Sequence, residues 1–426
     1  MLTAHPQREA LHNEVHARPY ERLTAPLVLS HIALVGDVER VREHIATLLH
    51  KRHLPLPAED ANHLSVDLGG LHLRWEKHTE FHTCTFWKQV HDAPESFDAP
   101  ALGDVPQDWL AAMPGQWLVG LHMLVRADKG AEAQPRIQQL VRRTLNEESL
   151  LGASVMDHDA EVFTDLQLAA DGFARFIVVC NGMSPRRLGR GLQRLLEIET
   201  YRMMALLGLP MAREVGASLM HAERDLASVA ELIRSAQRHQ EPELLRQLTL
   251  LAGQVESLYA RTHARFSASS AYFELVQRRI DELREERLEN LQTLGEFMDR
   301  RLAPAMQTCV WAARRQQALS ERISRTSNLL RTRVEIEQQQ SSQELLDAMN
   351  RRQKAQMLLQ SAVEGLSVAA VTYYGAGLVG YLAKGMKSAG WGVSPDVAVA
   401  VSIPLIGLVV WWGIRRLHRQ VSADVQ

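Results

Sequence analysis

The chain has 426 residues, of which 46% are hydrophobic and 23% are charged, so it can bury a sizeable core. Its first 184 residues hold 16 Lys and Arg against 25 Asp and Glu, a net charge of −9, which argues against nucleic acid as a partner. Three cysteines are too few for a disulfide framework and agree with a reducing compartment.

The first 183 residues predict a cytoplasmic α/β domain, because apolar, β-favouring runs alternate with amphipathic ones. A Pro- and Asp-rich stretch at 92–114 predicts a loop, and Asp171-Gly172 predicts the turn of a hairpin. The predicted strands are 27–35, 64–68, 71–87, 117–125, 161–169 and 173–180, and the predicted helices are 38–53 and 137–145.

Residues 184–362 predict a helical stem. Ser184-Pro185 begins it, Pro210 interrupts it, and a second long helix is expected from Glu241 to Arg301. The stretch 306–360 contains no Pro or Gly and predicts one unbroken helix. Its apolar seam at Leu319, Ile323, Leu330 and Val334 indicates a coiled coil. Residues 335–343 are polar apart from Ile336, so this helix needs neighbours or copies of itself, and we expect a homo-oligomer.

Two uncharged apolar runs follow, at 366–383 and 397–414. Each would span roughly 27 Å as a helix, close to the thickness of a bilayer core. They predict a transmembrane hairpin at 363–416 with a cytoplasmic tail at 417–426. A buried hairpin of a soluble protein is the alternative, which two such runs together disfavour.

The orientation of the hairpin follows from its basic flanks. Arg351, Arg352 and Lys354 precede the first run, and Arg415, Arg416 and Arg419 follow the second, whereas the connecting loop has only Lys384 and Lys387. The excess of positive charge predicts that both termini are cytoplasmic. The first 18 residues hold His, Glu and Arg in place of an apolar core, so we expect no signal peptide.

Three stretches resemble a bacterial family of uncharacterised membrane-anchored proteins, domain of unknown function 3422. They are Asn-Glu-Val-His-Ala-Arg-Pro at 13–19, Gly-Arg-Gly-Leu-Gln-Arg-Leu-Leu-Glu-Ile-Glu-Thr-Tyr-Arg at 189–202, and Val-Glu-Gly-Leu-Ser-Val at 363–368. The resemblance covers essentially the whole chain. It implies a bacterial inner-membrane location and brings no established activity with it.

The layout is also similar to that of CorA-type magnesium channels. In those homopentamers a cytoplasmic domain and a long stem helix lead into the first of two spans, which lines the pore and ends in Gly-Met-Asn. The corresponding residues here are Gly385-Met386-Lys387. Lys387 puts a cation where a hydrated cation would be recruited, which counts against the same selectivity.

Glu14, His16 and Arg18 alternate before Pro19, so an extended backbone would place them on one face. A carboxylate, an imidazole and a guanidinium together could bind an anion or move a proton. The alternative, which we favour, is an ion-pair cluster that docks the N-terminus onto the domain.

A second alternating series could ligate zinc, although we favour a solvated sheet face: His72, Arg74, Glu76, His78, Glu80, His82 and Cys84. Residues 181–191 join a strand to a helix with three glycines, and their spacing fits a simple turn better than a phosphate loop. No catalytic signature is present. We therefore expect no enzyme and no cofactor.

A polar stripe along the first span suggests an ion path. Ser367, Tyr374 and Tyr381 recur every seven residues, with Glu364 at one mouth and Lys387 beyond the other. One hypothesis is a homo-oligomer of CorA-like layout that passes or senses a divalent cation. The other is a membrane-tethered scaffold or regulator whose hairpin only anchors it in the lipid bilayer.

Overall fold

The computed structural model describes residues 4–9, 11–12, 19–36, 38–58, 61–128, 130, 132–390, 392 and 394–423. The chain divides into two compact units. Unit 1 comprises Met1–Ala236 and Glu243–Ser327, and unit 2 comprises Gln237–Pro242 and Asn328–Gln426. Helices α7 (Glu241–Leu283) and α8 (Leu294–Ser388) contribute residues to both units.

Unit 1 contains a nine-stranded sheet of order β2-β3-β4-β1-β5-β8-β7-β6-β9. The pair β5–β8 is parallel, and the other neighbours are antiparallel. The strands are β1 (Leu27–Val35), β2 (His63–Asp67), β3 (Leu71–Lys77), β4 (Phe81–Gln89), β5 (Gln116–Arg126), β6 (Leu151–Val155), β7 (Ala160–Thr164), β8 (Ala174–Cys180) and β9 (Glu286–Arg287). The predicted α/β sheet domain is therefore confirmed.

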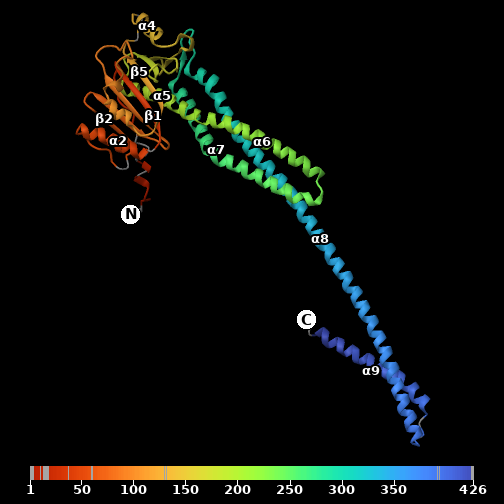
Figure 1. Ribbon diagram of the computed structural model, residues 1–426. Helices are drawn as coiled ribbons and strands as arrows, with labels where there is room; N and C mark the ends of the chain where they lie inside the picture. Colours follow the sequence, from red (N-terminus) through yellow and green to blue (C-terminus); the bar gives the residue numbers. More distant parts are fainter. Residues whose placement is uncertain are drawn as a thin grey trace. The chain divides into compact units, whose positions relative to one another are not determined.

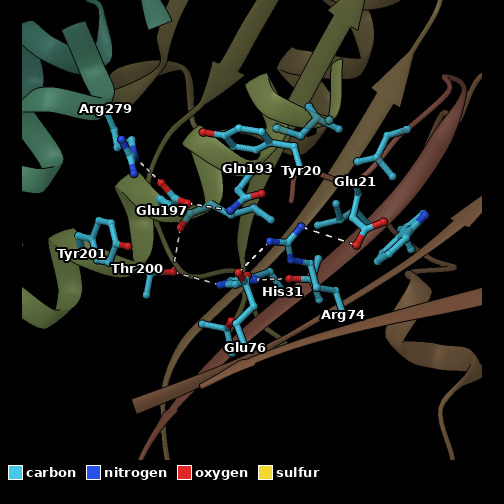
Figure 2. A pocket seen from close by; sticks show the side chains of 18 of the residues that line it. Tyr20, Glu21, His31, Arg74, Glu76, Gln193, Glu197, Thr200, Tyr201 and Arg279 are labelled. Carbon is cyan, nitrogen blue, oxygen red and sulfur yellow. Dashed lines mark hydrogen bonds and ion pairs between the residues drawn. The ribbon is translucent and has the colours of Figure 1, made fainter. Parts of the chain in front are cut away.

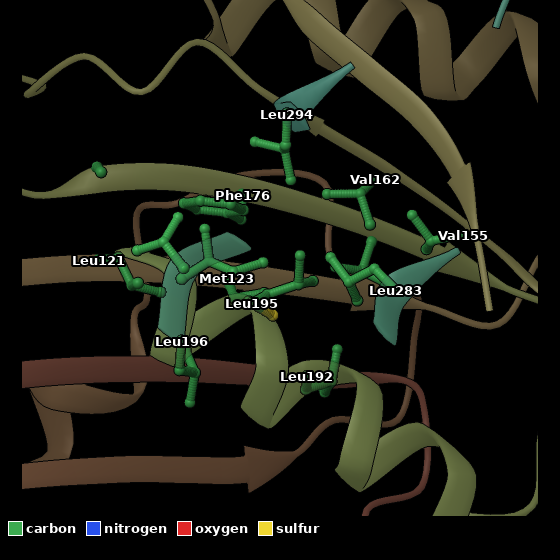
Figure 3. Close-up of a cluster of buried hydrophobic side chains, with 14 of the residues drawn as sticks. Leu121, Met123, Val155, Val162, Phe176, Leu192, Leu195, Leu196, Leu283 and Leu294 are labelled. Carbon is green, nitrogen blue, oxygen red and sulfur yellow. The ribbon is translucent and has the colours of Figure 1, made fainter. Parts of the chain in front are cut away.

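Helices cover both faces of this sheet, because its central strands are apolar on both sides (Figure 1). One face packs against α2 (Val38–Lys51), α3 (Gln107–Ala111) and α4 (Gln134–Thr144). The other face packs against α5 (Pro185–Leu206). Figure 3 shows Leu192, Leu195 and Leu196 of α5 against the side chains of the strands.

Three helices of unit 1 form a bundle beyond the sheet: α6 (Gly208–Ser235), α7 and the first part of α8. The paired amide and hydroxyl of Gln316 and Thr262 join α8 to α7 at 3.1 Å. The ion pair between Arg315 and Glu223 joins α8 to α6. Leu319 and Ile323 of the predicted seam are each 1% exposed, so this part of the seam is already buried within one chain.

Unit 2 holds the rest of α8 and helix α9 (Pro395–Ala423). Among the described residues, two helices are long and apolar enough to cross a membrane, Leu294–Ser388 and Pro395–Ile414. Within their most apolar windows only 11% and 6% of the residues are buried. The two helices touch through small residues, since a Cβ on Gly375 or Gly380 would lie 3.1 Å or 3.0 Å from Ile406 or Val399.

Two predicted elements are wrong in the same way. The stretch 71–87 is two strands, β3 and β4, joined by a turn at 78–80. The helix expected to reach Arg301 ends at Leu283, where Arg284 adopts a positive φ of 50°. Residues 286–287 then pair with β6, and Glu285 accepts hydrogen bonds from the first amides of α8. In both stretches the local composition favours one continuous element. The first folds back on itself, so that β3 pairs with β4, and the second is broken by the pairing of residues 286–287 with the distant strand β6.

Other differences are smaller. The predicted loop 92–114 contains a short 3₁₀ helix, Ala101–Asp104, and α3. Two more short 3₁₀ helices are Glu147–Ser149 and Arg238–Gln240. Strands β6 and β9 were not predicted. Pro304 lies inside α8, where the buried side chains of Leu302, Met306 and Cys309 hold the helix against its neighbours.

Close packing explains two glycines of the segment 189–202. A Cβ on Gly189 would lie 1.8 Å from the backbone oxygen of Glu21, which crosses α5 at that point. A Cβ on Gly191 would lie 1.9 Å from the methyl carbon of Met156. The chain before β1 therefore passes directly over the backbone of α5. Both glycines lie in α5, so of the expected turn at 181–191 only residues 181–184 connect the strand to the helix.

Candidate functional site

A polar cavity of about 230 Å³ lies between α5 and the sheet in unit 1 (Figure 2). Strands β1, β3 and β4 form its floor, and α5 and α7 contribute side chains from above. The segment before β1 supplies Tyr20 and Glu21. Charged and hydrogen-bonding groups are thus concentrated on a face that is otherwise apolar.

Strand register places the key side chains of the floor in one row. His31 pairs with Thr85, and Thr85 pairs with Arg74, across β1, β4 and β3. The next row contains Thr83 and Glu76. Because directly opposite residues in a sheet point to the same face, all of these side chains face α5. The sequence alone shows the alternation along β3 but not which strand lies beside it.

His31 is bound at both ring nitrogens. Its Nδ1 lies 2.8 Å from the hydroxyl of Thr85, and its Nε2 lies 3.0 Å from the hydroxyl of Thr200. Thr200 donates its own proton to the carbonyl oxygen of Leu196, so it accepts from His31, and the neutral ring is protonated on Nε2. Burial lowers the pKa of His31 to about 4, because the charged ring would lose its hydration.

Arg74 is the central cation of the cavity, and its side chain is 5% exposed. It lies 2.8 Å from Glu76 and 3.6 Å from Glu21, and it donates to the carbonyl oxygen of Pro19 at 2.8 Å. No acceptor among the described residues bonds its buried Nε. A buried donor without a partner costs about 1–3 kcal/mol, so this atom favours an oxygen supplied from the cavity.

The helical side of the cavity is also charged. Glu197 of α5 accepts a hydrogen bond from Gln193 at 2.9 Å and pairs with Arg279 of α7. Tyr201, one turn further along α5, stacks on Tyr272 with ring centroids 5.8 Å apart. The ion pair draws α7 onto the edge of the cavity and fixes the position of the Glu197 carboxylate.

The chemistry of the cavity is that of a binding site. Two arginines face three carboxylates, and the buried histidine is neutral, so the lining charges are Arg74 and Arg279 against Glu21, Glu76 and Glu197. Such a lining disfavours a strong anion and suits a ligand that has both donors and acceptors. No group of three potential metal ligands occurs among the described residues.

The described residues of the predicted ion path do not line this cavity. Glu14, His16 and Arg18 lie outside the described residues. Glu364, which accepts from Gln360 at 3.4 Å, and Ser367, Tyr374, Tyr381 and Lys387 all lie on the unit 2 part of α8. The two tyrosines are 72% and 76% exposed, on the side of α8 opposite Ala376 and Ala383, which are buried.

The alternating series in β3 and β4 is divided by the turn. Arg74 and Glu76 face the cavity and are 4% and 9% exposed, so they do not form a solvated face. His82 and Cys84 point to the other face, where Cys84 packs with Trp75. Sequence reasoning missed His31, Thr200 and Glu197. The only signal for the last two was their place in the segment 189–202, on the face of α5 that the helical pattern predicts to be buried.

Comparison with other proteins gives a family and no activity. A search of curated proteins found no match. The family described as "Protein of unknown function (DUF3422)" matches residues 3–421, nearly the whole chain. This match agrees with the resemblance of the segments 13–19, 189–202 and 363–368, and the chain therefore belongs to the family DUF3422.

Proposed function

We propose that this chain is a membrane-anchored binding protein whose α/β domain holds a small polar solute in the cavity beside Arg74. The observation that carries the proposal is the buried Nε of Arg74, which lines the cavity and has no acceptor among the described residues. Binding fits the site better than catalysis. Both nitrogens of His31 are engaged by hydroxyl groups, so the ring has no free position for proton exchange with a ligand.

The size and charge of the cavity define the solute. A volume of 230 Å³ is smaller than the roughly 300–1,000 Å³ of drug-sized sites, so the ligand is a molecule of few atoms. A carboxylate or carbonyl oxygen of the ligand would accept a hydrogen bond from Arg74 Nε. A cationic group on the same molecule would complement Glu76 or Glu197, because three carboxylates against two arginines leave the lining with one excess negative charge. A zwitterion such as a small amino acid meets both requirements.

Calorimetric titration of the full chain in lipid nanodiscs tests this assignment. Glycine and serine should bind, whereas acetate and methylammonium, which each present one half of a zwitterion, should bind much more weakly. Arg74→Lys keeps the positive charge but removes Nε, so it should abolish binding. Arg278→Lys, on the exposed side of α7, is the matched control and should bind as the wild type does. Equal binding by the Arg74 and Arg278 variants would contradict the proposal.

Anchoring in the bacterial inner membrane rests on exposed apolar surface. Leu366, Leu378 and Leu408 are 77%, 64% and 62% exposed, and a bilayer would cover such side chains. The basic residues that flank the two apolar helices favour a cytoplasmic location for both termini. A phosphatase that is active only in the periplasm should be inactive when fused after Gln426 and active when inserted after Gly390, between α8 and α9. The reverse pattern would overturn this orientation.

A second candidate function is cation passage by a homo-oligomer of CorA-like layout. One observation favours it: Ser367, Tyr374 and Tyr381 lie on the face of α8 that α9 leaves uncovered, where a second copy could meet them. In liposomes, Lys387→Asn should raise cation flux by removing a repelling charge, and Glu364→Gln should lower it. If both variants match the wild type, α8 and α9 serve only as an anchor.

A further inference from the structure

A second cavity, of about 470 Å³, lies on the opposite face of the sheet from His31. It is open between the C-terminal part of β1, helix α3 and the start of β5. Apolar side chains dominate its lining, among them Leu34, Leu110 and Met113. Its volume falls in the range of roughly 300–1,000 Å³ that is typical of small-molecule sites.

One wall of this cavity is aromatic and held in place by the backbone. Trp117 is 50% exposed, yet its indole nitrogen donates to the carbonyl oxygen of Val119 at 2.7 Å. The indole rests on two glycines, because a Cβ on Gly120 or Gly172 would lie 2.5 Å or 3.0 Å from its ring carbons. Phe173 lies beside it, with the ring centroids 4.9 Å apart. An exposed indole fixed in this way is a stacking surface for a planar ligand.

His122 supplies a single polar group. It is 3% exposed and stacks on Phe173 at 4.1 Å. Its Nδ1 lies 2.8 Å from the hydroxyl oxygen of Ser30. That oxygen also accepts a hydrogen bond from the backbone amide of Leu102 at 3.1 Å. No other group among the described residues accepts the proton of the buried Ser30 hydroxyl. The hydroxyl therefore donates to Nδ1, and Nε2 of the neutral ring carries the proton. Because His122 lines the cavity, it offers one hydrogen-bond donor there.

We propose that this cavity binds a neutral, planar aromatic molecule that accepts one hydrogen bond from His122. The aromatic wall and the aliphatic lining provide the stacking and apolar contacts. The nearby charged groups Asp171 and Arg175 form an ion pair with each other at 3.7 Å. Neither therefore requires a ligand of opposite charge. The site shares no lining residue with the cavity beside Arg74, so the proposal does not depend on the function proposed above.

Quinoline and indole are suitable probes, because both are soluble bicyclic molecules and only quinoline has an acceptor nitrogen. The full chain, labelled at its methionine methyl groups, would be titrated in nanodiscs and followed by NMR. Met113 lines the cavity, and Met306, buried in the core on the other side of the sheet, is the internal control. The Met113 signal should shift with quinoline in a saturable manner at concentrations up to about 10 mM, as expected for a ligand of this size.

Two variants separate the contribution of the apolar cavity from that of the hydrogen bond with His122. Ala111→Trp places a large side chain at an exposed position of the rim and should abolish the shift of Met113 without disturbing the core. Indole should bind roughly fivefold more weakly than quinoline, the effect of one net hydrogen bond. His122→Phe should remove that difference by weakening quinoline alone. An unchanged Met113 signal in the wild type, or an unchanged titration in Ala111→Trp, would overturn the proposal.

Discussion

At the scale of single residues, Thr200 determines whether His31 can be buried. Thr200→Val keeps the shape of the side chain and removes the acceptor for His31 Nε2. The buried ring would then hold an unsatisfied donor, and we expect a loss of about 1–3 kcal/mol of stability. Thermal unfolding followed by tryptophan fluorescence should show a lower melting temperature for Thr200→Val. Thr200→Ser retains the hydroxyl and should stay close to the wild type. Equal melting temperatures for the two variants would contradict this account.

His82 makes unit 1 sensitive to acid. Its ring is fully buried, and among the described residues neither nitrogen has a hydrogen-bond partner. Burial lowers its pKa from 6.5 to about 4. Between these values the unfolded chain binds more protons than the folded one. The contribution of His82 to the pH dependence therefore leaves stability unaffected above about pH 6.5 and lowers it by roughly 3 kcal/mol as the pH drops toward 4.

His82→Leu removes both the unpartnered nitrogens and the titrating group. We expect this variant to melt at a higher temperature than the wild type, with a larger difference at pH 5 than at pH 8. Melting curves recorded at the two pH values give the answer. A gain of the same size at both pH values would show that His82 does not titrate within this range.

Contacts between single residues were also the feature that the sequence predicted least well. Alternation along β3 correctly placed Arg74 and Glu76 on one face, but it could not show that α5 covers that face. The contacts of His31 join residues 54 and 169 positions apart in the sequence. No local pattern contains such separations. The candidate cavity therefore emerged only when the strands were placed side by side.

At the scale of elements, the crossing of α5 by the chain before β1 depends on Gly189. Gly189→Ala would force a Cβ against the backbone oxygen of Glu21, and we expect a clear loss of stability. Gly253→Ala on α7 is the matched control, because nothing lies within 4 Å of its Cβ position. That variant should be stabilised by about 1 kcal/mol through helix propensity alone. Opposite signs of the two shifts in melting temperature are the test.

Apolar patterning predicted most elements well, because α2 and α5 have apolar residues at helical spacing and β1 and β5 are continuous, β-favouring apolar runs. The prediction failed at the ends of elements that depend on distant partners. Residues 284–293 are rich in Glu, Arg and Leu and favour a helix by composition. Their pairing with β6 and the two positive φ angles at Arg284 and Asn290 are properties of the folded sheet.

At the scale of the whole molecule, we expect copies of the chain to associate through the unit 2 part of α8. Leu346, Met349 and Leu358 are 59%, 60% and 73% exposed, and a largely polar helix is unstable without a partner. A membrane anchor would also raise the local concentration of copies. Cys introduced at Leu346 should give crosslinked dimers in membranes. Cys at Leu330, which is 2% exposed within one chain, should not. A monomeric pattern for both variants would count against self-association.

Strand β9 has a consequence for biosynthesis. Residues 286–287 complete the sheet, so a nascent chain that ends before them leaves the edge of β6 uncovered. Leu366, the first residue of the apolar run, follows Arg287 by 79 positions. At roughly 5–20 residues per second, a ribosome covers that distance in about 4–16 s. Synthesis of the strand that completes the sheet therefore precedes synthesis of the first apolar run by seconds, and the sheet has that interval in which to close before Leu366 is added.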